Sequence, residues 1–306
     1  MRLFLRCAAT ALLVSLAHAQ PAEPLSPNTD VEARYTEASD QFVPIGEATV
    51  RIRTEGPQDG YPVILLHGFT FSLETWDQWA DALSPNFKVI RYDLMGHGLT
   101  GPDPQERYSP EERAATIGDV MDALDIEEAV IVGNSLGGLA AWRFAADHPE
   151  RVKRLVLVSP GAYAMNGVAD EPVPVPPALA YYLREVPEVG LRASIGRIYS
   201  YPDRISADRL QTLYDMMKRP GNGDAFVKSI EEFVLPDPAA ALAKVTSPTL
   251  LLWGTEDKVI PVDHAGRLLG HLPNAQLVLY PGIGHVPQEE SAKSIRDVKA
   301  FLYDLK

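Results

Sequence analysis

The sequence predicts an α/β fold: a mostly parallel sheet flanked by helices, with a helical segment inserted before the last strands. Short apolar runs, which suit strands buried on both faces, alternate along the chain with helix-like segments. This alternation stops over residues 161–238, which contain no clear buried strand, and then resumes. With 306 residues, 46% of them hydrophobic, the chain is long enough for one sizeable core with an insertion.

One alternating run and several continuous apolar runs predict the strands. Alternation is typical of a strand with one buried face, and a continuous run is typical of a strand covered on both faces, as in parallel sheets. Glycine-containing loops follow two of the early runs, at His67-Gly68 and within residues 93–98. The alternating run is 48–56, and the continuous runs lie in 61–68, 87–98, 129–135, 154–160, 248–254 and 275–280.

The helices between these strands have recognisable starts. Ser109 offers a capping hydroxyl, Pro110 suits the first turn, and Glu111 and Glu112 favour the positive end of the helix dipole. We expect this helix to continue to about Leu124. Strands that alternate with helices at this spacing indicate βαβ units. Further helices are expected at about 136–148, 262–271 and 288–305.

The chain therefore divides into a core and an insertion. Residues 41–160 and 239–306 form the expected α/β core, and residues 161–238 form a helical cap. The cap begins with the proline-rich letters EPVPVPP at 171–177 and continues with helix-like segments. Residues 20–40 are polar and contain proline without periodicity, so we expect a flexible leader there.

The first 19 residues have the pattern of a secretory signal peptide. Two arginines precede an apolar run over residues 8–17, and the Ala-His-Ala that ends at Ala19 matches a cleavage site. The run is too short to span a bilayer, which needs about 20 residues. We therefore expect cleavage after Ala19 and a secreted or periplasmic protein.

Charge and cysteine content restrict the class of partner. Cys7 is the only cysteine and lies within the expected signal peptide, so the mature chain could enter an oxidising compartment without a disulfide. The net charge of −13 would become −15 on loss of Arg2 and Arg6. Such acidity disfavours nucleic acid and anionic membranes. We expect a small-molecule substrate, no nucleic-acid partner and no membrane insertion.

A serine lies between glycines where a predicted strand meets a predicted helix. Gly133, Ser135 and Gly137 form a G-x-S-x-G pattern, in which the glycines allow a sharp turn. The N–H of Leu136 would then lie at a helix N-terminus, where a developing anion is favoured. A glycine-flanked serine is more often an ordinary turn, so a nucleophilic role depends on partners elsewhere in the chain.

Those partners follow other predicted strands in the required order. Asp257 follows the run at 248–254, and His285 follows the run at 275–280, which gives the order Ser, Asp, His. Both lie at the carboxyl ends of predicted parallel strands, where ligands bind in open α/β sheets. The loop LLHGF at 65–69 can supply a second oxyanion donor, the N–H of Phe69.

At these stretches the chain resembles the α/β-hydrolase family over roughly residues 41–306. The resemblance implies an eight-stranded, mostly parallel sheet with a helical lid after the sixth strand. It also implies that Ser135 is the nucleophile, His285 the base and Asp257 its orienting acid. Phe69 and Leu136 would form the oxyanion hole, and no metal or organic cofactor is implied. The matching letters are HGF (67–69), DLMGHGLT (93–100), GNSLGG (133–138), WGTEDKVIP (253–261) and GIGHVPQEE (282–290).

Several other polar residues lie near the same strand ends. We interpret His67 as a brace for the oxyanion loop and His97 as a turn residue, with a role as base left as the alternative for each. Asp93 ends a strand, but it precedes the serine and so breaks the expected order.

The acid and the pocket have their own alternatives. Glu256 and Asp263 flank Asp257, and placement at the strand end favours Asp257. Asn134 is interpreted as a residue that tolerates a strained backbone. Aromatic residues of the cap either line a pocket or belong to the cap's own core: Tyr163, Tyr181, Tyr182, Tyr199, Tyr201 and Phe233.

The turn around Ser135, called here the elbow, restricts the branch of the family to which the chain can belong. A serine there excludes haloalkane dehalogenases and epoxide hydrolases, which use an aspartate, and Leu136 does not match the tryptophan of proline iminopeptidases. The letters GNSLGG also resemble the elbow of hydrolases that cleave carbon–carbon bonds of ring-fission diketones. Those enzymes usually carry a tryptophan after the catalytic histidine, where this chain has Val286.

The leading hypothesis is a serine esterase, a carboxylic ester hydrolase for small-to-medium esters or lactones that works through an acyl-enzyme. The enzymatic alternatives are a carbon–carbon bond hydrolase and a cofactor-free perhydrolase. Outside enzymes, a receptor with an intact triad and little turnover is the alternative, with the lid as its signalling surface.

Overall fold

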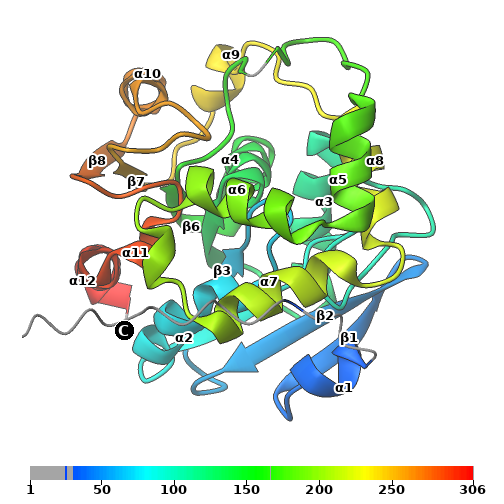
Figure 1. Cartoon of the computed structure of the whole chain (residues 1–306). Helices are drawn as coiled ribbons and strands as arrows, with labels where there is room; N and C mark the ends of the chain where they lie inside the picture. Colours follow the sequence, from blue (N-terminus) through cyan, green and yellow to red (C-terminus); the bar gives the residue numbers. More distant parts are fainter. Residues whose placement is uncertain (1–24, 26–29, 166, 306) are drawn as a thin grey trace, which may run out of the picture.

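The computed structural model describes residue 25, residues 30–165 and residues 167–305. The signal peptide expected at residues 1–19 lies outside this range. The expected fold class is confirmed: one eight-stranded sheet, mostly parallel, has helices on both faces and a helical cap beside it (Figure 1).

The strands of the sheet have the order β1-β2-β4-β3-β5-β6-β7-β8. β1 and β2 are antiparallel to each other, β2 is antiparallel to β4, and every later neighbour is parallel. The carboxyl ends of the parallel strands therefore meet at one edge. The strands are β1 (Asp40–Ile45), β2 (Ala48–Glu55), β3 (Tyr61–Leu66), β4 (Phe87–Tyr92), β5 (Ala129–Asn134), β6 (Val152–Val158), β7 (Thr249–Gly254) and β8 (Ala275–Tyr280).

Alternate residues of the buried strands supply two separate apolar layers. In β5, Ile131 belongs to the layer that packs on α3 (Pro110–Ala123) and α4 (Leu136–Asp147), together with α9 (Ala239–Leu242) and α10 (Asp263–His271). Val130 and Val132 belong to the opposite layer, under α2 (Asp77–Leu83) and α12 (Ala292–Phe301). The continuous apolar runs of the sequence result from this burial on both faces.

The described part of residues 161–238 contains four α-helices of the cap and a short turn of 3-10 helix at Pro202–Arg204, and these helices lie together against the core in Figure 1. These helices have their own apolar cluster, in which Leu183, Leu213 and Phe226 are buried. The cluster also includes Phe71 and Val286 of the core, so the cap packs directly on loops at the carboxyl edge of the parallel strands. The helices are α5 (Pro177–Glu185), α6 (Glu188–Ile198), α7 (Ala207–Lys218) and α8 (Asn222–Glu231).

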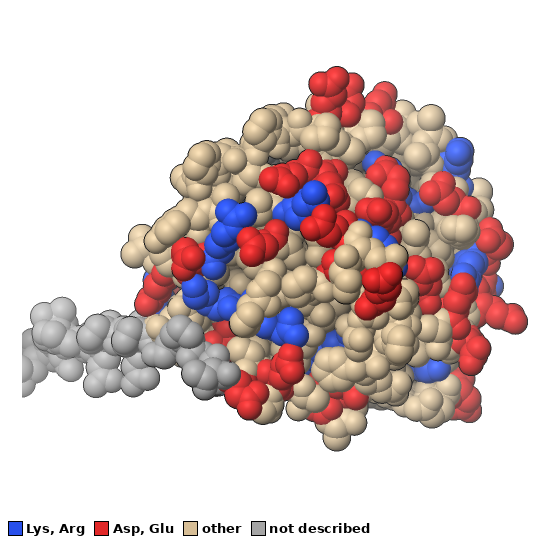
Figure 2. Space-filling view, turned by 90° about the vertical axis from the view of Figure 1, so that its right-hand side faces the viewer, with Lys and Arg blue, Asp and Glu red and all other residues tan. Residues whose placement is uncertain are grey.

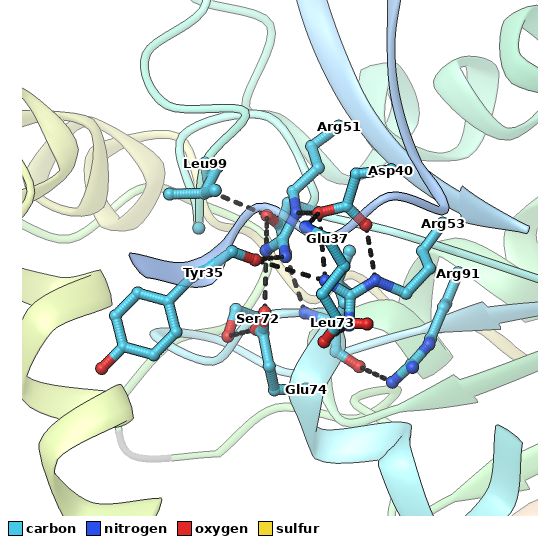
Figure 3. A network of polar contacts seen from close by, with 12 residues as sticks. Tyr35, Glu37, Asp40, Arg51, Arg53, Ser72, Leu73, Glu74, Arg91 and Leu99 are labelled. Atoms are coloured by element: carbon cyan, nitrogen blue, oxygen red, sulfur yellow. Dashed lines mark hydrogen bonds and ion pairs between the residues drawn. The ribbon is translucent and has the colours of Figure 1, made fainter. Parts of the chain in front are cut away.

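The antiparallel edge contains a network of buried ion pairs (Figure 3). Arg51 of β2 donates from Nε to Asp40 Oδ2 at 2.8 Å and from Nη1 to Glu74 Oε1 at 2.8 Å, and Arg53 also pairs with Asp40. Both guanidinium groups contact the carbonyl oxygen of Tyr35 as well. The network thus ties β2 to the chain that precedes β1.

The chain before β2 and the C-terminus differ from the sequence-based expectation. The end of the expected leader at 20–40 has structure of its own: Val31–Tyr35 form helix α1, and the unpredicted strand β1 begins at Asp40. Pro44 and the polar residues of β1 hide its pattern, since this edge strand is buried only at Ile45. The helix expected at 288–305 is interrupted at Ser291, which separates α11 (Pro287–Glu290) from α12. The turn Leu73–Trp76 and helix α2 were also not predicted.

The surface matches the acidic composition. Figure 2 shows acidic side chains over much of one face, with Lys and Arg interspersed among them. In the part of the chain that the structure describes, no helix has the length and apolar character to cross a membrane.

Candidate active site

Ser135 occupies a strained turn between β5 and α4. Its backbone angles are φ 53° and ψ −111°, a region that residues with a side chain rarely adopt. The turn is held by its neighbours, because Ser135 donates its N–H to Val158 O at 3.0 Å and accepts at its own carbonyl from Gly161 N at 3.1 Å. The strain therefore falls on the serine, and Asn134, which we had interpreted as the strained residue, is an ordinary member of β5.

The flanking glycines are required by close backbone approach. A Cβ at Gly137 would lie 2.5 Å from Leu66 O, and a Cβ at Gly133 would overlap the carbonyl of Gly137. Real Cβ atoms do not approach other atoms so closely, so a side chain at either position would push α4 away from β3 and β5. The G-x-S-x-G pattern thus results from the tight packing of the helix start against the sheet.

Two backbone N–H groups next to Ser135 are available for a ligand. Leu136 is the first residue of α4, where backbone N–H groups have no partner within the helix. Phe69 lies in the loop after β3, and a Cβ on its neighbour Gly68 would come within 3.2 Å of Ser135 Cβ. Within the described residues, neither N–H donates a hydrogen bond, whereas the next one, Gly137 N, donates to His67 O at 3.1 Å.

Asp257 and His285 form a buried pair at the ends of β7 and β8. His285 Nδ1 lies 2.8 Å from Asp257 Oδ2. Asp257 Oδ1 accepts from Val259 N at 2.8 Å and from Ile260 N at 2.9 Å, which fixes the carboxylate. Burial acts to raise the pKa of Asp257, but His285 and the two N–H groups outweigh it and hold this pKa below the ordinary value. The carboxylate is therefore ionised and oriented toward the imidazole.

The histidine loop is attached both to the elbow and to the cap. Asn134 Nδ2 donates to His285 O at 3.2 Å, which joins the residue before the serine to the histidine. His285 N donates to Ile198 O at the end of α6, at 2.8 Å. Glu290 accepts from Gly284 N at 2.9 Å and from Ser200 N at 2.8 Å, and so links the same loop to the cap a second time.

The described chain shows no hydrogen bond between Ser135 Oγ and His285 Nε2. Such bonds are often long in free enzymes and tighten when a substrate binds. The link between the two loops that the structure shows is the bond from Asn134 Nδ2 to His285 O.

Ser135 opens into a cavity of about 410 Å³ between the core and the cap. Its walls are mostly apolar, and only Arg113, Ser135 and Ser229 among the lining residues have polar side chains. The apolar walls are Phe69, Leu136, Gly161, Met165, Val168, Val173, Pro174, Pro176, Leu179, Ile230, Phe233, Val259 and Ile260.

His67 and His97 have structural surroundings, as we had interpreted them. His67 Nδ1 lies 2.8 Å from Gly68 O, and its Nε2 accepts from Leu94 N at 2.9 Å, so both ring nitrogens are used. Burial lowers the pKa of His67 to about 4. His97 packs its ring on His67 and on Phe226 of the cap.

The other competing residues lie away from the serine or bind elsewhere. Asp93 accepts from Leu73 N and Leu99 N, both at 2.8 Å, and thereby holds two loops together. Glu256 and Asp263 are exposed, and no hydrogen bond joins either to His285 in the described residues. Of the cap aromatics, only Phe233 lines the cavity, whereas Tyr199 donates to Glu289 at 2.8 Å and Tyr181 is 61% exposed.

Arg113 and Ser229 are pocket residues that sequence reasoning missed. Arg113 lies in α3 and Ser229 in α8, and their side chains meet at 2.7 Å although 116 positions separate them. The sequence contains no local signal for this contact. In the described residues, no three His, Cys, Asp or Glu side chains are grouped as metal ligands.

The sequence is similar to a family of hydrolases along most of its length. The family model described as "alpha/beta hydrolase fold" matches residues 61–292. A 2-hydroxy-6-oxononadienedioate/2-hydroxy-6-oxononatrienedioate hydrolase from Cupriavidus pinatubonensis is 30% identical, over 89% of this chain and 98% of its own length. A 2-hydroxy-6-oxo-6-phenylhexa-2,4-dienoate hydrolase from Burkholderia cepacia is 27% identical, over 82% of this chain and 92% of its own.

A solved structure agrees with these relatives. A meta-cleavage product hydrolase from Pseudomonas fluorescens IP01 superposes with a TM-score of 0.76 and 26% identity, over 87% of this chain and 98% of that one.

Proposed function

The chain belongs to the α/β-hydrolase fold family, and on this premise we propose that it hydrolyses a carbon–carbon bond next to a ketone in a 2-hydroxy-6-oxo dienoate. In this proposal Ser135 is the nucleophile, His285 the base and Asp257 its orienting acid. The two relatives named above support the bond type, because each is named as a hydrolase of a substrate of this class. The similarity to this chain covers nearly the whole length of both relatives. Ester hydrolysis, the leading hypothesis from the sequence, becomes the second candidate.

The observation that carries the proposal is the pair His285–Asp257 at 2.8 Å beside a strained, glycine-flanked Ser135. A serine hydroxyl is a poor nucleophile without a base, and the base needs a partner that holds its tautomer. Asp257, itself held by two N–H groups, keeps the proton of His285 on Nδ1. Nε2 is then the lone-pair nitrogen that accepts the proton of the serine.

The reaction would begin with the keto tautomer of the substrate, in which carbon 5 has gained the proton of the 2-hydroxyl group. Ser135 Oγ attacks the ketone carbon 6, and its proton moves to His285 Nε2. The new oxyanion accepts from the N–H groups of Phe69 and Leu136, which have no other partner in the described chain. Both donors are backbone groups, so they need no reorganisation when the charge develops.

The bond between carbons 5 and 6 then breaks. Its electron pair delocalises from carbon 5 through the carbon 3–carbon 4 double bond to the oxygen on carbon 2, and His285 returns its proton to this departing enolate. The acyl group stays on Ser135 Oγ. Water, activated by His285, attacks the acyl-enzyme and releases a carboxylic acid with the free serine.

The test compares the two bond types on one protein. 2-Hydroxy-6-oxo-6-phenylhexa-2,4-dienoate and p-nitrophenyl esters from acetate to octanoate are assayed with the wild type and with Ser135→Ala. We expect the dienoate to have the higher kcat/KM and Ser135→Ala to lose activity on all substrates. Equal rates for both proteins would remove Ser135 as the nucleophile. A higher kcat/KM for the esters would favour the second candidate.

Ester hydrolysis remains the second candidate because of Val286. Ring-fission hydrolases of this family usually have a tryptophan after the catalytic histidine, whereas Val286 is fully buried in the cap's apolar cluster. The same serine, base and oxyanion donors would cleave an ester, with an alcohol as the leaving group.

We also propose that the protein is exported and processed after Ala19. The support is the signal pattern of residues 1–19 alone, which lie outside the described residues. Expression of the full chain with a bacterial export system tests it. A mature protein in the periplasm or medium that begins at Gln20 is the expected result, and an uncleaved cytoplasmic protein would overturn the proposal.

A further inference from the structure

A buried positive charge lies in the wall of the candidate active-site pocket. Arg113 is 2% exposed, yet it lines the same cavity as Ser135. The other polar side chain of this wall, Ser229, touches it. All remaining lining residues are apolar or glycine, so Arg113 supplies the ionic group of this pocket.

The guanidinium group of Arg113 binds only neutral acceptors. Nε donates to Tyr108 O at 3.0 Å, Nη1 to Met95 O at 3.0 Å and Nη2 to Ser229 Oγ at 2.7 Å. An arginine has five N–H donors, so these three bonds leave two hydrogens on the terminal nitrogens. Ser229 Oγ accepts from Arg113, and in the described part of the chain its hydroxyl hydrogen is not donated to any group. This hydroxyl is therefore a third donor at the same place.

No carboxylate of the described chain forms an ion pair with Arg113. Glu112 and Glu232 act on it only from a distance, since Glu112 is used in the cap of α3 with Ser109 and Glu232 pairs with Lys228. Burial is the main cause that lowers the pKa of Arg113 to about 10, so the group is still charged at neutral pH. A buried charge without a counter-ion is costly, and an anion that entered the pocket would relieve this cost.

Other buried arginines of the protein are paired with acids. Arg51 contacts Asp40, Glu74 and Asp93, and Arg91 contacts Glu55 at 2.9 Å. The lack of an acid at Arg113 is therefore particular to the pocket.

We propose that Arg113 and Ser229 form an anion subsite that binds a carboxylate of the substrate, at the end away from the bond that Ser135 attacks. The guanidinium fork would hold one or both carboxylate oxygens, and the Ser229 hydroxyl would add a donor. Because Arg113 belongs to the core helix α3 and Ser229 to the cap helix α8, the anion would also bridge core and cap (Figure 1). This subsite deepens the proposed function and rests on it.

A binding experiment separates the subsite from the chemistry. Hexanoate and its uncharged isostere hexanamide are titrated by calorimetry into the wild type, Arg113→Met and Arg113→Lys. We expect the wild type to bind hexanoate at least about tenfold more tightly than hexanamide, as a charge-assisted hydrogen bond does. Arg113→Met should lose this preference and keep its affinity for hexanamide, and Arg113→Lys should keep part of the preference.

Two results would overturn the subsite. One is a wild type that does not prefer hexanoate, a result that needs no variant to fold. The other is an Arg113→Met protein that binds hexanamide normally and still prefers hexanoate. Because calorimetry measures binding and not turnover, the outcome is independent of the Ser135→Ala assay. A failed carbon–carbon cleavage with an intact hexanoate preference would refute only the reaction.

Discussion

Two regions of the molecule bury guanidinium groups, and they surround them in opposite ways. At the antiparallel edge, Arg51 and Arg53 meet carboxylates on nearly every nitrogen (Figure 3). In the pocket, Arg113 meets two carbonyls and a hydroxyl. The first arrangement neutralises charge inside the fold, and the second keeps charge available at a cavity. The difference shows that burial alone does not distinguish the two guanidinium environments, and the proposed anion subsite rests on the missing counter-ion beside a cavity.

The largest effect should come from the His285–Asp257 pair and should leave the fold intact. Replacing Asp257→Asn removes the charge that orients His285 and allows the wrong imidazole tautomer, so kcat should fall about 10⁴-fold, the loss known for the same change in a serine protease triad. Steady-state assays and a thermal melt measure both quantities. Glu256→Gln, an exposed neighbour, is the control and should remain as active as the wild type.

The antiparallel edge should show the reverse pattern. Asp40→Ala leaves Arg51 and Arg53 without their shared carboxylate, so the free energy of unfolding should fall by about 3–5 kcal/mol. Urea denaturation measures this loss. Activity per folded molecule should not change, and Asp59→Ala in an exposed turn should be neutral. Loss of activity without loss of stability would contradict the distinction between the regions.

The contributions of the two regions to the free energy of unfolding should also be lost at different pH values. His67, beneath the pocket loops, has its pKa lowered to about 4 by burial, so the unfolded chain takes up a proton first as the pH falls. Its contribution, complete above about pH 6.5, should therefore decline by about 3 kcal/mol between pH 6.5 and 4.

At the edge, burial acts to raise the pKa of Asp40, but Arg53 and Arg51 outweigh it and hold this pKa below the ordinary value, so its contribution should persist to lower pH. Urea melts of the wild type and His67→Gln from pH 7 to 4 test the predicted contribution of His67. The stability difference between the two proteins should shrink across the range. His148→Gln, at an exposed histidine, should retain the wild-type profile.

The smallest effect should fall on the apolar wall of the pocket. Phe233→Ala removes a half-buried ring from the cavity and should raise KM by roughly tenfold, with a smaller change in kcat. Tyr181→Ala, at an exposed ring of the same cap, should leave both constants as they are. Equal effects of the two changes would mean that the cavity wall does not bind substrate.

Sequence reasoning predicts the features that short stretches of chain determine. The strands β2 to β8 and the helices α3 and α4 follow from local periodicity and capping. The candidate residues Ser135, Asp257 and His285 follow from strand ends in a fixed order. Arg113 looked like any polar helix residue, because only the fold brings it to Ser229. The role of Asn134 was equally hidden, since its amide reaches His285 O across 151 positions. The edge strand β1 was missed because its pairing with β2, and not an apolar pattern, makes it a strand.

Val286 links the packing of the cap to the position of His285, the candidate base. It directly follows His285 in the chain, and it is buried among cap residues such as Leu183 and Ile195. An engineer who exchanges residues 161–238 for the cap of another family member would therefore also alter the packing under the histidine. Such a chimera therefore needs residue 286 redesigned together with the new cap, because one side chain packs against the cap while its neighbour in the chain, His285, contacts Asp257.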